Sequence, residues 1–468
     1  MNGQIRLAAC LFTGSLFGCS SNGATTSDPN AIVLAALADS TGASATTLYA
    51  TAINLAASQM NQAMASANSN IRFNVRVVDS QSDPAHSQAA VAELINTEGI
   101  KGVVTDISGD TVSVNMLNYD PSSSASYKVP VTCYLCSSAF INNPDAADAD
   151  PTRENAMRDG DGWLFRTFFN AKYEAAVQTR IALNRGDQGD VNGDGVFKVG
   201  VYASDDSYGQ SSAAAVKDAV ARLRMGKSAV EVLFQPPKVD ANSYDWGGDL
   251  QTLLDDRNEE TKEVDGKPDA IFLTLLSLGA TAAAKAYHEA AYTTPLQATT
   301  AFRRNYILRS LTTAAEGIEG NSPRLVSNDE SGSAFKNAFE IASSGEPTEM
   351  GCSGAYDSTI ALMLAAVKAS ISLDNPSDVD ASDVRAALAQ ISDPEGTVIH
   401  ATVDDFAYAY RLLRDGGTIA YQGASGATNY DSAGDAHPAL VHWKVQQQHF
   451  IESEDYDCRS DPLCAPQQ

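Results

Sequence analysis

Residues able to bind a metal ion stand close together in the segment Asp190-Val-Asn192-Gly-Asp194-Gly195. Three oxygen-bearing side chains at alternate positions, followed by glycine, are the spacing of a calcium loop, because calcium prefers oxygen ligands and glycine permits the sharp turn. The acid that usually closes such a loop is missing, although Asp187 could supply a ligand. We therefore expect either a structural calcium site at Asp190, Asn192 and Asp194 or a polar turn before a strand.

Cysteines provide a second set of reactive groups. Cys458 and Cys464 flank a short turn that contains Asp-Pro, and this spacing predicts a local disulfide. Cys133 and Cys136 have the CxxC spacing of a redox pair, but they fall in a predicted strand and not at a helix start, where a thiolate would be stabilised. A structural role is therefore favoured over a redox or metal role, and one of these two could instead pair with Cys352.

Spacings typical of enzymes are incomplete. His288-Glu289 lacks the second histidine of a zinc-protease helix, Ser425 lies outside a Gly-x-Ser-x-Gly turn, and the sequence has no Gly-rich phosphate loop with its lysine. The 58 Asp and Glu against 32 Lys and Arg give a net charge of −26, which disfavours nucleic acids and anionic membrane surfaces as partners. The sequence therefore predicts neither an enzyme nor a nucleic-acid-binding protein.

The N-terminus has the composition of an export signal. Residues 1–18 contain Arg6 and then an apolar run that is too short to span a bilayer. The segment Leu-Phe-Gly-Cys that ends at Cys19 resembles a bacterial lipobox, in which the cysteine becomes the lipidated first residue; an ordinary secretory signal is the alternative. Residues 19–30 are small and polar, as in a flexible tether. We expect a lipid-anchored protein of the bacterial cell envelope that faces the periplasm or the outside.

The elements that must position these residues alternate between strand and helix. Apolar runs suited to buried strands are separated by segments with helical spacing. The first series of strands is expected at 31–37, 73–78, 102–105 and 129–134, and the second at 198–202, 229–234, 270–275 and 305–308. Alternation of this kind predicts parallel sheets covered by helices on both faces. The fold class is therefore α/β, with two doubly wound lobes joined by a hinge.

Seven short motifs follow one another along nearly the whole chain, from about Ala31 to Glu452. They are the opening strand, loop and helix at 31–56, Asp79 to Pro84, Ser108-Gly-Asp-Thr111, Phe165-Arg166, Asp206-Ser-Tyr208-Gly209, Tyr356-Asp357, and a C-terminal set made of Gly423–Gly426, Tyr430 to Asp435 and His442–Val445. Each is weak alone. In this order they resemble the type I periplasmic binding proteins, specifically the leucine/isoleucine/valine-binding branch of the solute-binding proteins of ABC transporters.

The resemblance implies a division into lobes. Residues 31–165 with 321–435 would form lobe 1, residues 166–320 with 436–456 would form lobe 2, and residues 457–468 would form a C-terminal tail. A solute would bind in the cleft between the lobes and be enclosed when the hinge closes.

The resemblance also implies a binding site. The residues that correspond to ligand contacts are Ser108, Ser137, Ser138, Tyr208 and Ser277. The alternative for each serine is a hydroxyl that caps a helix N-terminus. Relatives that bind α-amino acids place a carboxylate at the next strand end for the ammonium group. The corresponding segment here, 307–313, has no acid and carries Arg309, which would favour an anion.

These features together predict a lipid-anchored extracytoplasmic solute-binding protein of an ABC importer. It would capture a small polar solute, such as an amino acid, an amide or a carboxylate, and deliver it to a membrane permease. We expect the protein to be a monomer that catalyses no reaction. We expect no cofactor other than a structural calcium ion. The alternative is a ligand-sensing or interaction lipoprotein with the same fold and no transport role.

Overall fold

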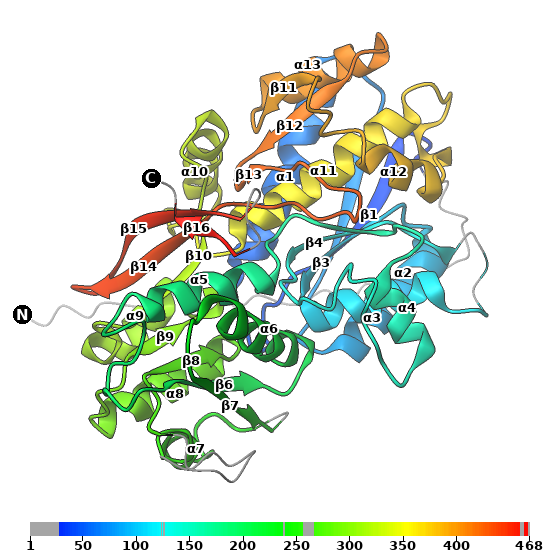
Figure 1. Cartoon of the computed structure of the whole chain (residues 1–468). Helices are drawn as coiled ribbons and strands as arrows, with labels where there is room; N and C mark the ends of the chain where they lie inside the picture. The colour runs from blue at the N-terminus through cyan, green and yellow to red at the C-terminus, as the bar shows by residue number, and fades with distance from the viewer. Residues whose placement is uncertain are drawn as a thin grey trace, which may run out of the picture.

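The computed structural model describes residues 28–122, 124, 127–236, 239–255, 266–458 and 463–466. The expected signal peptide, Cys19 and most of the expected tether lie outside these residues. Among the described residues, no helix combines the length and the apolar character needed to cross a membrane. The chain folds into two α/β lobes, one built around β1, β3 and β4 and the other around β6, β7 and β8 (Figure 1).

The first lobe contains a five-stranded, fully parallel sheet in the order β2-β1-β3-β4-β5. Its strands are β1 (Ala31–Leu37), β2 (Arg72–Val78), β3 (Val103–Ile107), β4 (Val131–Leu135) and β5 (Leu164–Arg166). Its helices are α1 (Leu48–Ser66), α2 (Pro84–Glu98), α3 (Ser108–Tyr119), α4 (Pro151–Arg158), α10 (Glu330–Ala342), α11 (Cys352–Ser370), α12 (Ala381–Leu388) and α13 (Val403–Arg414). A small sheet of β11 (Thr397–His400), β12 (Ile419–Gly423) and β13 (Gly426–Ala427) lies beside them.

Strand β1 shows why this lobe has two apolar cores. Ile32, Leu34 and Ala36 belong to the core that contains α1 and α11, whereas Ala35 and Leu37 belong to the core that contains α2 and α3. Successive side chains of a strand point to opposite faces of the sheet. Because helices cover both faces, the strand is apolar nearly throughout, as expected for a buried parallel sheet.

The second lobe contains an eight-stranded sheet in the order β16-β15-β14-β10-β9-β8-β6-β7. Its strands are β6 (Phe197–Ser204), β7 (Ser228–Gln235), β8 (Ala270–Thr274), β9 (Leu296–Ala298), β10 (Glu319–Pro323), β14 (Leu440–Gln446), β15 (His449–Asp457) and β16 (Ala465–Pro466). Its helices are α5 (Ala171–Leu183), α6 (Ser207–Leu223), α7 (Trp246–Leu253), α8 (Ser277–Glu289) and α9 (Asn305–Leu311). The part β7-β6-β8-β9-β10 is parallel and repeats the strand order of the first lobe, and β14 adds to it in antiparallel orientation.

The two-lobed α/β class expected from the sequence is confirmed, but one predicted strand is wrong. Residues 305–308 begin helix α9, and the strand of this part of the sheet is the short β9. Ile307, Leu308 and Leu311 are buried in α9. A short apolar run does not distinguish a buried strand from a buried helix face, so the apolar pattern of residues 305–308 fits both elements.

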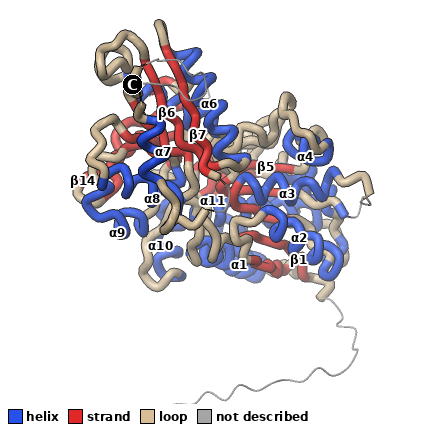
Figure 2. Tube along the Cα trace, turned by 90° about the horizontal axis from the view of Figure 1, so that it is seen from below, coloured by secondary structure: helices blue, strands red, loops and turns tan. Residues whose placement is uncertain are grey.

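The chain passes between the lobes three times: after β5, after β10 and before β14. Figure 2 shows the two lobes from below, with β1, α1 and α2 in one and β6, β7 and α6 in the other. Arg166 at the end of β5 pairs with Asp435 in an isolated parallel bridge, so two of the three crossings lie side by side. The exact lobe boundaries remain predictions; the strands nearest to them end at Arg166 and Pro323.

Candidate functional site

The shared strand order places a crevice in each lobe. In a doubly wound sheet of this order, ligands bind beyond the carboxyl ends of the strands, where neighbouring connections leave toward opposite faces. This point lies between β1 and β3 in the first sheet and between β6 and β8 in the second. The crevices of the two lobes open onto the same cavity.

This cavity is small in the arrangement seen here, with a volume of about 40 Å³. The first lobe contributes Ser44, Ile107, Ser108, Leu135 and Ser137 to its lining; Phe168 after β5 and the second-lobe residues Tyr208, Leu276, Thr300, Ala301 and Arg304 complete it. Ligand pockets commonly measure roughly 300 to 1,000 Å³. The cavity seen here is far smaller, so a solute held by both lobes requires the lobes to stand further apart than in this arrangement.

Three of the five predicted ligand residues, Ser108, Ser137 and Tyr208, line the cavity. Ser108 starts α3, and its hydroxyl accepts a hydrogen bond from the Ser138 amide at 3.0 Å, which ties two predicted loops together. The Tyr208 hydroxyl donates to Oγ1 of Thr299 at 2.7 Å. The predicted residues of both lobes thus meet at one place, while their contact with a ligand stays a prediction.

The other two predicted residues support the cavity from behind. Ser138 is fully buried, and its hydroxyl donates to the Ser207 carbonyl at 2.9 Å, across the gap between the lobes. Ser277 is also fully buried, and its hydroxyl donates to the Ala301 carbonyl at 2.7 Å. Neither residue is part of the cavity lining.

Two helices begin at the cavity without a capping side chain. The N-cap residues of α3 and α8 are Ile107 and Leu276, both of which line the cavity and neither of which makes a side-chain cap hydrogen bond. The first amides of a helix lack intrahelical acceptors and carry partial positive charge. The N-terminus of α6 differs, because Asp206 accepts a hydrogen bond from the Gly209 amide at 2.8 Å.

Arg304 is the functional candidate that the sequence prediction missed. It lines the cavity and is only 2% exposed. Its Nη1 donates to the Met350 carbonyl, its guanidinium carbon lies 5.5 Å from the ring centroid of Tyr49, and its Nε has no hydrogen-bond partner among the described residues. The predicted cation, Arg309, is exposed on α9. The strand predicted at 305–308 placed Arg309, and not Arg304 five residues before it, at a strand end.

Acidic side chains near the cavity are occupied by other partners. Oε1 of Glu174 accepts hydrogen bonds from the amide and hydroxyl of Thr300, at 2.8 and 2.7 Å. Burial outweighs these bonds and raises the pKa of Glu174 to about 7. Behind the Ser108 turn, burial and then the neighbouring Asp106 carboxylate raise the pKa of Asp110 to about 10, so Asp110 is neutral at pH 7.

The lobes contact each other directly around the cavity. Besides the bond from Ser138 to Ser207, the Ala139 amide donates to the Ser211 hydroxyl at 3.2 Å, and the Leu278 amide donates to the Ala43 carbonyl at 3.3 Å. The first two bonds join the loop after β4 to α6, and the third joins the start of α8 to the loop after β1. They hold the lobes together beside the cavity, which stays partly open to solvent.

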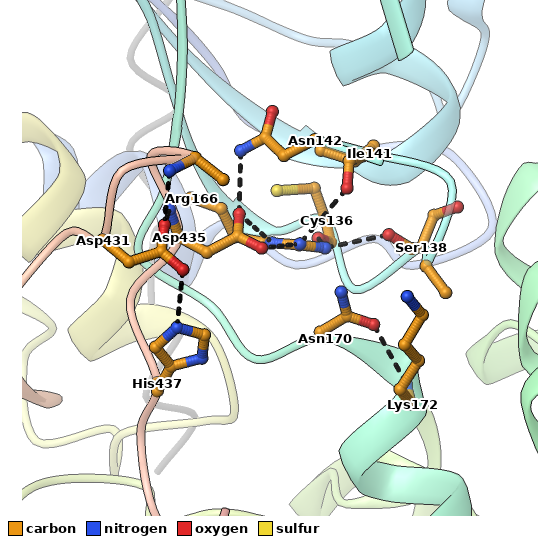
Figure 3. Close-up of polar contacts among 12 residues, drawn as sticks. Cys136, Ser138, Ile141, Asn142, Arg166, Asn170, Lys172, Asp431, Asp435 and His437 are labelled. Carbon is orange, nitrogen blue, oxygen red and sulfur yellow. Dashed lines mark hydrogen bonds and ion pairs between the residues drawn. The ribbon is translucent and has the colours of Figure 1, made fainter. Parts of the chain in front are cut away.

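The hinge carries a buried network that reaches the same loop (Figure 3). Arg166 is fully buried; its Nε donates to Oδ1 of Asp435 at 2.9 Å and its Nη1 donates to the Ser138 carbonyl at 2.8 Å. Asp431 pairs with Nε2 of His437 at 2.9 Å. Burial opposes ionisation of Asp431, but hydrogen bonds from His437 and from backbone amides lower its pKa to about 2. The network fixes the Ser137–Ser138 loop to the hinge.

The cysteine and calcium expectations have separate outcomes. The structure joins Cys458 to Cys464, the predicted pair, and joins Cys133 to Cys136; the suggested bridge to Cys352 is wrong, because Cys352 is free and buried.

In the expected calcium loop, the side chains bind their own backbone. Both carboxylate oxygens of Asp190 accept hydrogen bonds, from the Gly193 and Gly195 amides, at 2.7 and 2.9 Å. No group of three or more His, Cys, Asp and Glu side chains in the described part of the chain is arranged to hold a metal ion. Calcium binding here stays a prediction.

No protein-family model and no curated protein sequence matches this chain. Solved structures match it well. A leucine-binding protein from Thermotoga maritima aligns with 91% of this chain and 98% of its own, at a TM-score of 0.65 and 14% identity. A branched-chain amino acid binding protein of Streptococcus pneumoniae in complex with isoleucine aligns with 90% of this chain and 100% of its own (TM-score 0.60, 15% identity).

A third match is an ABC-transporter solute-binding protein from Rhodopseudomonas palustris in complex with 3,4-dihydroxybenzoic acid. It aligns with 92% of this chain and 98% of its own, at a TM-score of 0.64 and 16% identity. These structural neighbours are type I periplasmic binding proteins of ABC transporters. The likeness shows that this chain has their two-lobed fold.

Proposed function

We propose that the protein is an extracytoplasmic solute-binding protein of an ABC importer, anchored to lipid through Cys19. The observation that carries this proposal is the cavity between the lobes, which collects Ser108 and Ser137 from one lobe and Tyr208 from the other. These are residues that the family resemblance places at the ligand. The neighbours that bind isoleucine, benzoate and hydroxylated benzoates support a small amino acid or carboxylate as the solute.

Capture would work through the hinge. A solute that contacts both lobes favours the closed arrangement, because only the closed form makes both sets of contacts. Closure removes the solute from water and brings together the interlobe hydrogen bonds of Ser138 and Ala139. The permease would then recognise the closed form, and the solute would leave unchanged.

The binding proposal can be tested with the soluble form that starts at Ser20. A thermal-shift screen of amino acids, carboxylates, amides, sugars and calcium should raise Tm with one solute class, since a ligand that binds only the native state stabilises it by mass action. Ser108→Ala should weaken that shift, whereas Ser113→Ala, a half-buried serine of the same helix, should leave it unchanged. A screen in which no solute shifts Tm would contradict the proposal.

Two further experiments address transport and anchoring. Deletion of the protein from its source bacterium should abolish uptake of the solute found in the screen; normal uptake would favour the alternative, a sensing lipoprotein. Metabolic labelling with a fatty acid should mark the wild type and spare Cys19→Ala. Labelling of both proteins, or of neither, would contradict the anchor at Cys19.

A further inference from the structure

We infer that the solute is a small carboxylate without an ammonium group, whose carboxylate pairs with Arg304 and whose compact apolar body fills the rest of the cavity. This inference rests on the proposed function and names the ligand class of the same site. It departs from the α-amino acids that the family resemblance implies.

Arg304 is a buried cation without an ion pair among the described residues. Arg304 lines the cavity, is 2% exposed, and keeps an Nε without a partner among the described residues. Its described contacts are the neutral carbonyl of Met350 and the ring of Tyr49. The Glu349 carboxylate attracts it from beyond ion-pair distance, and this carboxylate accepts its hydrogen bond from the Asn305 amide. A buried guanidinium is costly unless an anion neutralises it, and its planar donors match a carboxylate.

The neighbouring Arg303 also has an Nε without a described partner, but its charge is paired within the protein. Its Nη1 donates to the Ser322 hydroxyl at 2.7 Å and to the Pro323 carbonyl at 2.9 Å, and its Nη2 forms an ion pair with Glu452. Both arginines are almost fully buried. Arg303 therefore completes its charge within the protein, and Arg304 points to a charge that comes from outside.

The other described groups that line the cavity carry no negative charge. Among the described lining residues, Arg304 is the charged one, and no carboxylate lines the cavity. The starts of α3 and α8 add partial positive charge without capping side chains. Hydroxyls of Ser108 and Ser137 can donate to a second carboxylate oxygen.

The acids nearest to the cavity do not offer a place for an ammonium group. The Asp39 carboxylate accepts hydrogen bonds from the Gly42 amide at 2.6 Å and the Ser44 amide at 2.9 Å. Glu174 is held by Thr300, and Glu349 accepts the Asn305 amide at 2.8 Å. An α-amino acid would bury its ammonium without a counter-charge, which is unfavourable.

Apolar side chains form one part of the cavity lining. Ile107, Leu135, Phe168 and Leu276 supply side chains from both lobes and from the crossing between them. All four come from strand ends or the residues just after them, so their positions are fixed by the sheets. They suit a branched aliphatic or aromatic body.

Matched sets of three compounds test the inference on the wild-type protein. Leucine, 4-methylpentanoate and 3-methylbutylamine share one aliphatic body, and phenylalanine, 3-phenylpropionate and 2-phenylethylamine share one aromatic body. Calorimetry should give the carboxylate of at least one set a Kd at least about tenfold lower than its amino acid, and no heat with the amines. Benzoate and a neutral sugar complete the panel.

Variants then assign the charge to Arg304. Arg304→Gln should weaken carboxylate binding by about 100-fold, and Arg304→Lys should recover part of it. Arg309→Gln is the matched control, an exposed arginine five residues away, and should bind as the wild type does. The Tm of each variant without ligand shows that it is folded.

The outcomes separate this inference from the proposed function. Tighter binding of the amino acid, or of an amine or sugar, would overturn the inference and leave the binding-protein proposal standing. Carboxylate binding that survives Arg304→Gln in a folded variant would overturn the role of Arg304. A panel in which nothing binds would contradict both proposals.

Discussion

The two lobes repeat one strand order, yet they bring different chemistry to the cavity. The first lobe offers neutral donors, chiefly the hydroxyls of Ser44, Ser108 and Ser137, and keeps the acid Asp110 protonated behind them. The second lobe supplies Arg304 together with Tyr208. An anionic solute would therefore gain its ion pair from the second lobe and its remaining hydrogen bonds from the first. A common scaffold thus divides charge and hydrogen bonding between two halves, so that one solute needs both.

The largest expected effect comes from breaking the link between the lobes. Asp435→Ala leaves Arg166 as an unpaired buried cation, because that arginine is fully buried and pairs with Asp435. Removing one partner of a buried pair typically costs about 3 to 5 kcal/mol. Urea unfolding should show this loss.

The exposed pair Arg222–Asp218 provides the control for the hinge, since its side chains are 56% and 55% exposed. Asp218→Ala should change the free energy of unfolding by less than about 1 kcal/mol. Similar losses for Asp435→Ala and Asp218→Ala would show that the hinge network does not hold the lobes.

A smaller effect should follow from the buried acid of the second lobe. Burial raises the pKa of Glu174 to about 7 in the folded protein, above its ordinary value of 4.5. The folded state then holds this proton more tightly than the unfolded state, so stability falls as the pH rises from about 4.5 to about 7, by up to about 3 kcal/mol.

Glu174→Gln keeps an oxygen for the Thr300 donors and removes the titration. Denaturation at several pH values should show a flatter profile between about 4.5 and 7 for the variant than for the wild type. Buried Asp357 of the first lobe, whose pKa burial raises to about 6, titrates in both proteins and cancels in the difference. Parallel profiles would contradict the account of Glu174.

Two glycines near helix starts, one in each lobe, sharpen the comparison of the lobes. A Cβ on Gly209, in α6, would lie 2.0 Å from the Ser204 carbonyl oxygen, whereas one on Gly109, in α3, would meet only Cγ of Pro84 at 3.0 Å. Gly209→Ala should therefore lower stability by about 1 to 3 kcal/mol. Gly109→Ala should change stability by about 0.5 kcal/mol or less, because the higher helix propensity of alanine offsets the close contact. Equal Tm values for the two variants would contradict this difference.

The smallest expected effect concerns the interlobe contacts. Ser138→Ala removes the hydrogen bond to the Ser207 carbonyl without removing a group that lines the cavity. A neutral hydrogen bond contributes about 1 kcal/mol, so solute release should become about fivefold faster in stopped-flow measurements. Ser113→Ala, on α3 and outside the cavity lining, should leave the release rate unchanged.

Much of the fold followed from the sequence because alternation of strand and helix is a local signal. The motif order also located Ser108, Ser137 and Tyr208, which the structure brings to one cavity. Arg304 could not be found in this way. Arg303 and Arg304 are adjacent and equally cationic in the sequence, and only the fold brings Glu452 to one of them and the cavity to the other.

Cysteine pairing shows the same limit. The spacing of Cys458 and Cys464 is short enough to predict their disulfide, and the structure contains it. For Cys133, Cys136 and Cys352, the sequence left two pairings open, because the distance between β4 and α11 is a tertiary property. The structure joins the first two and leaves Cys352 buried, where burial raises its thiol pKa to about 12.

The most direct test of the two-lobed account is a distance measurement across the cleft. Spin labels at Ala85→Cys on α2 and Ser243→Cys before α7, both exposed positions, report the separation of the lobes. Addition of 4-methylpentanoate should shorten this distance in the wild type and leave it unchanged in Arg304→Gln. A solute that raises Tm without changing the distance would contradict capture by closure of the lobes.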